Sequence, residues 1–328
     1  MKVCIVGAGA IGGFIGTRLA AAGRADVSAL ARGATLAALR EHGWRLRSGD
    51  AFTQAPARAN ADPTELGVQD LVVVAVKGPA LGAVAAAIAP LLGAETMVLP
   101  AMNGVPWWFC HGLPGFGDAP LASLDPGGAI ARAIPLRHVV GCVVHASTST
   151  PEPALVLHRM GQGLIVGEPA GGQSERVQRL ASLLAHAGFD VTHSADVRHD
   201  IWYKLWGNLT MNPVSALTGA TMDRILADPE LVDFCTAAML EAAAIGARLG
   251  CTITQTPQDR HLITAKLGAF KSSMLQDVEA QRPIELDTIV RAVHEIGQRL
   301  GLPVVMIGAL LGLTRVFGQV RGIYPRVS

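Results

Sequence analysis

The stretch Val3-Cys-Ile-Val-Gly-Ala-Gly-Ala-Ile-Gly12 decides the fold of this chain. Its four leading apolar residues predict a short buried strand, and a helical pattern follows the glycines. In such a unit Gly7 permits a tight turn, Gly9 lets the backbone approach a pyrophosphate, and Gly12 lets the helix pack against the strand. The free N–H groups at the start of the helix favour phosphate. A dinucleotide site is therefore predicted, the alternative being a purely structural turn. The residues of that site would be Gly7, Ala8, Gly9, Ala10, Ile11 and Gly12.

Strand and helix patterns continue to alternate after this unit. The expected strands are 3–6, 27–30, 71–76 and 96–99, and the expected helices are 14–22, 34–41 and 79–92. Such alternation predicts an α/β doubly wound parallel sheet of the Rossmann type. Two further strands are expected at 139–147 and 155–166, with Gly161-Gln-Gly163 as a turn.

The character of the chain changes after about residue 191. Helical periodicity dominates at 199–211, 231–249, 258–266 and 284–300, and strand signals become sparse. We therefore expect an all-α C-terminal domain, with residues 1–192 forming an NADP-binding domain and residues 193–328 forming a helical substrate and catalytic domain. A length of 328 residues suits two domains.

Composition excludes several classes of protein. Half of the residues are hydrophobic, 16% are charged, and the net charge is +1, so neither disorder nor nucleic-acid binding is expected. The five cysteines are scattered without a C-x-x-C motif, which predicts no metal site and a reducing, cytoplasmic location. The early glycines argue against a secretory signal, and no apolar run is long enough to predict a membrane span.

The end of the second expected strand bears on the choice of cofactor. The sequence Ala29-Leu-Ala-Arg32 offers no carboxylate for a ribose 2′-hydroxyl. Arg32 could instead clamp a 2′-phosphate, which predicts NADP(H) as the cofactor. The alternative is a solvated surface arginine.

Two polar positions follow later strands of the same sheet. Lys77 comes after the strand 71–76, and Asn103 and Gly104 come after the strand 96–99. Ligands bind at the carboxyl edge of such sheets. Lys77 and Asn103 are therefore predicted to contact the cofactor or substrate, although a snorkelling lysine and an ordinary Asn-Gly turn are the structural alternatives.

A polar ladder marks the second domain. Lys204, Asn208 and Asn212 are four residues apart, which places them on one face of a helix. Reduction of a ketone develops negative charge on oxygen, and a nearby ammonium can stabilise that charge and supply the proton. Lys204 is the candidate catalytic acid, with both asparagines as substrate contacts. Pro213 predicts that the helix ends or kinks at Asn212.

Two more groups are candidates on weaker grounds. Ser273, in Lys271-Ser-Ser-Met-Leu-Gln-Asp277, is a small donor suited to a carboxylate. Glu285 lies in Arg282-Pro-Ile-Glu285-Leu-Asp287, where acidic residues at a helix start are more often structural.

Taken together, these motifs resemble the ketopantoate reductase (2-dehydropantoate 2-reductase) family. The matching elements run in family order and cover nearly the whole chain; they are the glycine motif, Arg32, Lys77, Asn103-Gly104, the ladder, Ser272–Asp277 and Ile284–Asp287. The resemblance implies a Rossmann domain followed by a helical domain like the C-terminal domain of 6-phosphogluconate dehydrogenase. It also implies reduction of 2-dehydropantoate by NADPH to (R)-pantoate, a step of pantothenate and CoA biosynthesis.

The same resemblance assigns roles to individual residues. Lys204 matches the family's proton donor, and Glu285 matches a residue at the cofactor and substrate, which overrides its structural interpretation. The substrate-binding positions are matched by Asn103, Asn208, Asn212 and Ser273, and the further cofactor contacts by Lys77, Asn103 and Ala146.

One departure from the family leaves the substrate open. A long Gly/Pro-rich loop with Trp107, Trp108 and Phe109 follows Asn103. The two tryptophans either reshape the pocket for a bulkier 2-oxo acid, act as a lid, or pack onto the domain surface. A same-family reductase of a bulkier acid is therefore the nearest alternative. An NADP-sensing regulator without turnover is less favoured, because the candidate acid is present.

Few partners are expected beyond a small-molecule 2-oxo acid. No nucleic acid or membrane partner is predicted. The apolar stretch 304–317 either covers the core of the helical domain or forms the face of a homodimer, and the sequence leaves both open.

Overall fold

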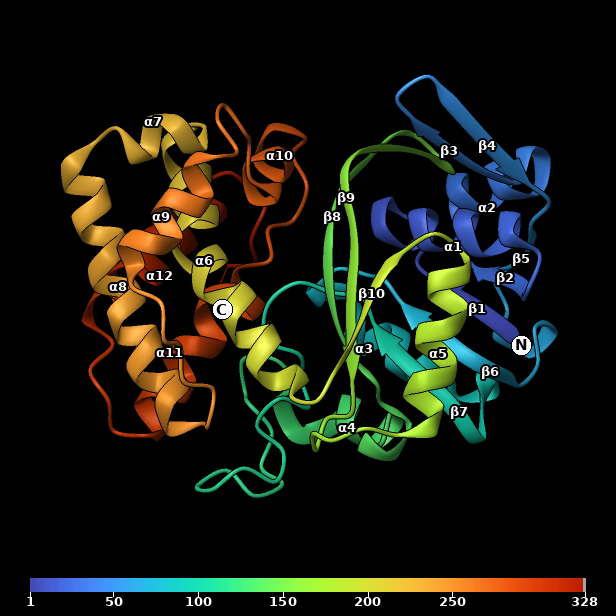
Figure 1. Cartoon of the computed structure of the whole chain (residues 1–328), viewed down its shortest axis with the longest axis horizontal. Coiled ribbons are helices and arrows are strands. Elements are labelled where there is room, and N and C mark those ends of the chain that lie inside the picture. The colour runs from blue at the N-terminus through green and yellow to red at the C-terminus, as the bar shows by residue number, and fades with distance from the viewer. Residues whose placement is uncertain (327–328) are drawn as a thin grey trace. The chain divides into compact units, whose positions relative to one another are not determined.

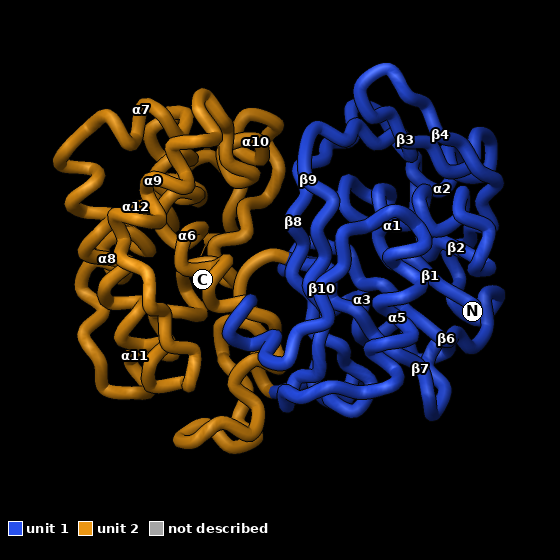
Figure 2. Tube along the Cα trace, in the orientation of Figure 1, with its two compact units in different colours: residues 1–102, 128–200 blue, residues 103–127, 201–328 orange. Residues whose placement is uncertain are grey.

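The computed structural model describes residues 1–326, and the chain divides into two compact units. Unit 1 comprises residues 1–102 and 128–200, and unit 2 comprises residues 103–127 and the chain from residue 201 (Figure 2). The chain thus enters unit 2 for a short segment, returns to unit 1 and then completes unit 2. The assignment of separate functions to residues 1–192 and 193–328 stays a prediction.

A five-stranded parallel sheet forms the centre of unit 1, which confirms the predicted fold class (Figure 1). Its strands follow the spatial order β5-β2-β1-β6-β7, and every neighbouring pair is parallel. The strands are β1 (Lys2–Val6), β2 (Asp26–Leu30), β5 (Arg58–Asn60), β6 (Gln69–Val74) and β7 (Leu92–Pro100). The helices that follow them are α1 (Ala10–Ala22), α2 (Gly33–His42) and α3 (Gly78–Ala87). The predicted strands and helices all exist, with ends that differ by a few residues.

A second sheet in unit 1 has the strand order β10-β9-β3-β4, and β8 pairs with β9. It contains β3 (Trp44–Ser48), β4 (Ala51–Ala55), β8 (Gly141–Glu152), β9 (Leu155–Gly167) and β10 (Asp190–Ser194). The expected turn at residues 161–163 is wrong, because β9 continues through it and the hairpin turns at residues 153–154. Gly161, with φ +73°, instead faces an irregularity of β8 between His145 and Ser147. The short helix α4 (Ala129–Ala133) and the helix α5 (Glu175–His186) complete unit 1.

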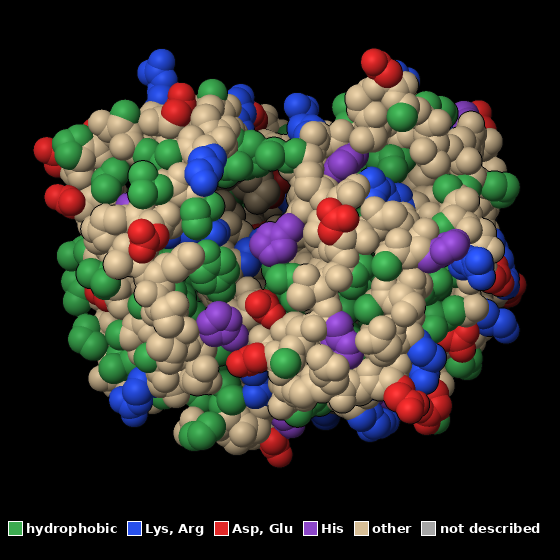
Figure 3. All heavy atoms as spheres, in the orientation of Figure 1, with side chains coloured by type: hydrophobic (Ala, Val, Ile, Leu, Met, Phe, Trp, Pro, Cys, Tyr) green, Lys and Arg blue, Asp and Glu red, His purple; other side chains and the backbone are tan. Residues whose placement is uncertain are grey.

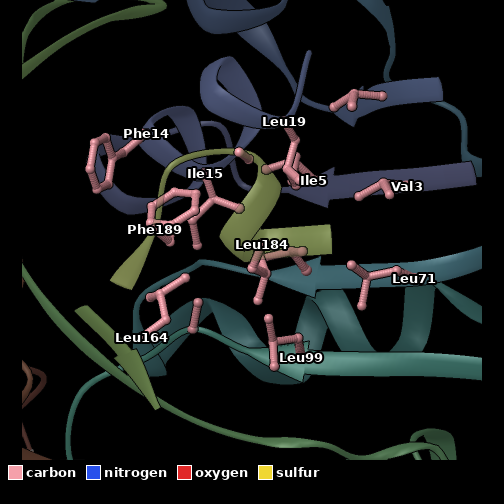
Figure 4. Close-up of a cluster of buried hydrophobic side chains, with 14 of the residues drawn as sticks. Val3, Ile5, Phe14, Ile15, Leu19, Leu71, Leu99, Leu164, Leu184 and Phe189 are labelled. Atoms are coloured by element: carbon pink, nitrogen blue, oxygen red, sulfur yellow. The ribbon is translucent and has the colours of Figure 1, made fainter. Parts of the chain in front are cut away.

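The core of unit 1 lies between these elements (Figure 4). Ile5 and Leu71 contribute from the parallel sheet, Phe14 and Ile15 from α1, and Leu184 from α5; each is fully buried. When both faces of a parallel sheet are covered, the side chains on both faces are buried. The strands of such a sheet are therefore almost continuously hydrophobic. This packing fixes the turn between β1 and α1.

Unit 2 is helical. It contains most of α6 (Val197–Thr218), then α7 (Met222–Leu226), α8 (Pro229–Arg248), α9 (Pro257–Ala265) and α10 (Ser273–Glu279). A π-helix, η5 (Asp287–Arg291), leads into α11 (Ala292–Arg299), and α12 (Val305–Val320) follows. The predicted all-α character is confirmed. Of the two alternatives predicted at Asn212, an end of the helix is wrong, since α6 continues through Pro213 to Thr218. A kink at that position stays a prediction.

Two tryptophans fix the orientation of α6 within unit 2. The indole N–H of Trp202 donates to the carbonyl of Ala242 at 3.2 Å, and that of Trp206 donates to Met239 at 2.8 Å. Both indoles are fully buried against α8. Since positions 202 and 206 share one face, the face that carries positions 204, 208 and 212 is turned away from α8.

None of the helices within residues 1–326 is both long and apolar enough to cross a membrane. No group of three or more His, Cys, Asp or Glu side chains is placed to hold a metal ion within that range. The five cysteines all lie in this range, are buried and form no disulfide. On the face in Figure 3, basic and acidic side chains are interspersed and no field of one sign stands out.

Candidate active site

The glycine motif forms a close turn between β1 and α1. Gly7 has φ +90°, and a Cβ there would lie 2.6 Å from Val76 Cγ1. A Cβ on Gly12 would overlap the carbonyl oxygen of Gly7, whereas one on Gly9 would meet nothing within 4 Å. The turn therefore needs Gly7 and Gly12 for its own packing, and the backbone beside Gly9 is open for a ligand to approach.

A cavity of about 300 Å³ lies beside this turn in unit 1. Its walls are small apolar side chains from the strand ends and α3, together with Arg32 and Thr35 at the start of α2. The full lining is Val6, Gly7, Ala8, Gly9, Leu30, Ala31, Arg32, Thr35, Val76, Ala80, Ala83, Val84 and Ala87. Apolar walls with a cation and a hydroxyl suit the adenosine end of a dinucleotide. The motif and Arg32 thus lie on one cavity, as a dinucleotide site requires.

Two other cofactor candidates lie elsewhere in unit 1. Lys77 is the N-cap residue of α3 and directly follows Val76, which lines the cavity. Ala146 lies in β8 at the irregular pairing opposite Gly161. Irregularities of this kind redirect side chains and are over-represented next to active sites.

The polar ladder of unit 2 starts with a direct contact. The Lys204 ammonium donates to the Oδ1 atom of Asn103 at 2.8 Å. Lys204 is half-buried on α6, and Asn103 is half-buried in the segment 103–127. The structure thus brings together two candidates that are 101 residues apart in sequence. An ammonium oriented by a neutral amide keeps its charge available for an oxyanion.

The remaining ladder residues lie further along α6. Asn208 is half-buried and Asn212 is buried. The Ser272 hydroxyl lies 3.5 Å from the backbone oxygen of Asn212 and caps α10, of which Ser273 is the first residue. Ser273 itself is exposed. The start of α10 therefore lies beside the far end of the ladder.

A close contact with the π-helix fixes the backbone next to Asn103. Gly104 has φ +82°, and a Cβ there would overlap the carbonyl group of Thr288. The N–H of Val105 donates to that same Thr288 oxygen at 2.8 Å. Single π-turns inside helices are frequent at functional sites. Here the π-helix η5 provides a fixed docking point for the residues that follow Asn103.

The rest of the segment 103–127 is fastened to α6 and α11. Phe109 stacks on Trp202 with ring centroids 5.7 Å apart. The Glu295 carboxylate accepts from the N–H groups of Ala122 at 2.9 Å and Ser123 at 2.8 Å. Arg299 donates to Pro120 O at 2.7 Å. These contacts describe an anchored loop rather than a mobile lid.

Trp107 and Trp108 are also buried, with exposed fractions of 5% and 3%. Of the three interpretations of this loop, packing of the tryptophans onto the domain surface comes nearest to this burial, although both indoles lie inside the protein and not on its surface.

Glu285 lies in the short connection between α10 and η5 and is half-buried. The hydroxyl of Thr288 lies 3.4 Å from the backbone oxygen of Glu285. Thr288 thus touches the backbone of Gly104 and Val105 as well as that of Glu285. One residue of the π-helix therefore connects Glu285 with the two residues that follow Asn103.

A parallel-sheet unit with a glycine turn and a helical unit with an oriented lysine define the chain as a two-domain oxidoreductase of the dinucleotide-binding class. Family models agree with this. The ketopantoate reductase PanE/ApbA model matches residues 3–108, and the model of the ketopantoate reductase PanE/ApbA C terminal matches residues 196–317.

Individual relatives agree as well. The 2-dehydropantoate 2-reductase of Mesorhizobium japonicum is 44% identical over 325 residues, covering 99% of this chain and 100% of that protein. A crystal structure from Ralstonia solanacearum MolK2 is 53% identical, with a TM-score of 0.95 over 98% of this chain and 99% of the other. The crystal structure of 2-dehydropantoate 2-reductase from Geobacter metallireducens GS-15 is 27% identical in sequence, with a TM-score of 0.84 over 97% of this chain and 100% of the other. The chain belongs to the ketopantoate reductase family.

Sequence reasoning missed several residues that shape these sites. Thr35 lines the dinucleotide cavity three residues after Arg32, and its place in the first turn of α2 could have revealed it. Thr288 and Glu295 gave no such signal, because their contacts with the segment 103–127 depend on tertiary structure.

Proposed function

We propose that this protein reduces 2-dehydropantoate (ketopantoate) with NADPH to (R)-pantoate, as a cytoplasmic step of pantothenate and CoA biosynthesis. The contact of 2.8 Å between Lys204 and Asn103 carries the proposal, because it presents an oriented ammonium on a polar helix face. The 44% identity to a 2-dehydropantoate 2-reductase supports the choice of substrate.

The residues of unit 1 fit an NADPH molecule. Its pyrophosphate would lie against the open backbone at Gly9 and the start of α1. The adenosine would occupy the cavity, where Arg32 and Thr35 would hold the 2′-phosphate. Lys77 and Ala146 would contact the rest of the cofactor. When bound, NADPH supplies the hydride that adds to C2 of the oxo acid.

The residues of unit 2 would hold the substrate and manage its proton. Asn208, Asn212 and Ser273 would donate hydrogen bonds to the substrate. Lys204 would face the ketone oxygen, stabilise the charge that develops there and transfer one proton from its ammonium to that oxygen. The resulting amine regains a proton from water after the hydroxy acid leaves. Asn103 would orient Lys204 in this scheme, and Glu285 would contact the cofactor and the substrate.

Oxidation of NADPH at 340 nm, with purified protein and a panel of 2-oxo acids, tests this proposal. The expected result is a kcat/KM for 2-dehydropantoate above that of every other acid in the panel. A higher value for a bulkier acid, such as an aryl-substituted one, would keep the reaction class and reject the substrate. Absence of turnover with every acid would reject the function as a whole.

A further inference from the structure

The chain after α12 turns back towards the connection that carries Glu285. Ile323 and Tyr324 both donate their backbone N–H to the carbonyl of Gly318, at 2.9 and 3.1 Å. A Cβ on Gly318 would lie 2.7 Å from Tyr324 Cβ and 3.1 Å from Ile284 Cδ1. Because Gly318 has no side chain, Tyr324 and Ile284 can both pack against α12 at this position.

Two hydrogen bonds from this turn bracket Glu285 along the chain. The N–H of Ile284 donates to the carbonyl of Ile323 at 3.1 Å. The hydroxyl of Tyr324 donates to Asp287 Oδ1 at 2.6 Å. Glu285 lies between these two attachment points, in a connection that has no helix or strand of its own before residue 286.

The contact between Tyr324 and Asp287 is suited to hold a backbone in place. Only 9% of Tyr324 is exposed. Burial, together with the hydrogen bond to Asp287 and its negative charge, raises the pKa of Tyr324 to about 12, so the hydroxyl stays a donor at any physiological pH. Arg291 also approaches Asp287, at 3.4 Å and with half of its side chain exposed. A hydrogen bond to an ionised acceptor is stronger and more directional than one between neutral groups.

We propose that Tyr324 is a positioning residue of the reductase, which acts through Asp287 to fix the backbone that carries Glu285. This inference rests on the proposed function, because Glu285 takes its role from it. Tyr324 itself need not touch substrate or cofactor.

The test is a double-mutant cycle in the full-length protein with NADPH and 2-dehydropantoate. Tyr324→Phe removes only the hydroxyl and should lower kcat/KM by about tenfold, which corresponds to about 1.4 kcal/mol of transition-state stabilisation. In a Glu285→Gln background the same substitution should change kcat/KM by less than about twofold, because the group that it positions is already altered.

Three further measurements separate positioning from general damage. Tyr203→Phe is the matched control, since it removes the hydroxyl of the only other tyrosine, which bonds to the exposed Gln255 at 2.7 Å. Asp287→Asn keeps an acceptor oxygen and should retain most of the activity. Asp287→Leu removes the acceptor and should lower kcat/KM by about as much as Tyr324→Phe does. Fluorescence titration of NADPH and the thermal midpoint of each variant report cofactor binding and folding independently of turnover.

The inference is overturned if Tyr324→Phe retains full activity. It is equally overturned if Tyr324→Phe lowers kcat/KM by the same factor in the unaltered protein and in the Glu285→Gln background. The inference is also overturned if the Glu285→Gln variant has the same kcat/KM as the unaltered protein. A strong loss of activity in Lys204→Ala would then show that the proposed function holds although Glu285 takes no part in it. Absence of turnover by the unaltered protein would instead reject the proposed function, and with it the role of Tyr324.

Discussion

Lys204 donates a hydrogen bond of 2.8 Å to Asn103, which reaches it from a segment that the chain inserts into the helical unit. The lysine stands on a helix whose opposite side is fixed by two buried indoles. The asparagine precedes a glycine that is locked against the π-helix. Both partners are therefore held by rigid surroundings, and such preorganisation makes an ammonium effective at a developing oxyanion.

Replacement of Lys204 by alanine should lower kcat strongly, by roughly 10²–10⁴-fold, because the proton donor is lost. The Kd for NADPH should be nearly unchanged, since the cofactor cavity lies in unit 1. Steady-state kinetics and fluorescence titration measure the two quantities. Lys266→Ala, at an exposed lysine of the same unit, is the control and should behave like the unaltered protein. Undiminished turnover by Lys204→Ala would remove this residue from the mechanism.

Arg32→Ala should weaken binding of NADPH much more than binding of NADH, by about tenfold or more, because only NADPH carries the 2′-phosphate that Arg32 would hold. The comparison needs Kd values for both cofactors with each protein. Arg24→Ala removes another exposed arginine, which lies outside the cavity, and should leave both Kd values unaltered. An equal loss of affinity for NADPH and NADH would argue against a phosphate contact at Arg32.

Gly104→Ala and Gly112→Ala form a matched pair in one loop. Both glycines have positive φ, +82° and +73°, so each alanine should cost about 1 kcal/mol of stability through backbone strain. Only at Gly104 does the new Cβ also overlap the Thr288 carbonyl, since nothing lies within 4 Å at Gly112. Gly104→Ala alone should therefore displace Asn103 and lower kcat, by up to about 10²-fold. Thermal midpoints and kcat of both variants decide this, and equal kcat values would contradict the prediction.

The attachment of the loop by Glu295 should depend on pH. Burial alone would raise the pKa of this carboxyl, but hydrogen bonds from Ser123 and Ala122 and the charge of Arg299 outweigh it and lower the pKa. A carboxyl whose pKa is lower in the folded state contributes stability above its unfolded value of about 4.3, and this is lost as pH falls through the folded value.

Glu295→Gln should therefore lower the thermal midpoint at pH 7 and have a smaller effect near pH 4. Because the group is partly exposed, the loss at pH 7 should be about 1 kcal/mol. Glu175→Gln, at a fully exposed carboxylate of α5, is the control. An effect of Glu295→Gln that stays constant between pH 4 and pH 7 would speak against this account.

Local patterns made much of this architecture predictable. The spacing of Lys204, Asn208 and Asn212 is a property of one helix, and the glycine motif is a property of one strand–turn–helix unit. Neither depends on distant contacts, so both could be read from the sequence. The strands β3 and β4 were missed even though Trp44-Arg-Leu-Arg-Ser48 alternates apolar and polar residues and Gly49-Asp50 marks a turn.

Other features have no local signature. The segment 103–127 looks like a connection of the parallel sheet, and only its contacts with Thr288, Trp202 and Glu295 place it in unit 2. Likewise, Pro213 opposes a helix by its own chemistry, yet the buried surroundings of α6 carry the helix through it. Tertiary packing decides both cases, and a single sequence does not display it.

The insertion of residues 103–127 also has a consequence for how the protein is made. During synthesis from the N-terminus, Ala122 and Ser123 leave the ribosome 173 and 172 residues before the glutamate that binds them. Until then the segment carries Trp107, Trp108 and Phe109 without the helices that complete unit 2, so the nascent chain offers an apolar stretch to chaperones or to other chains. Any fragment that starts at residue 201 would lack this piece, so the helical half is expected to depend on the first half for its own completion.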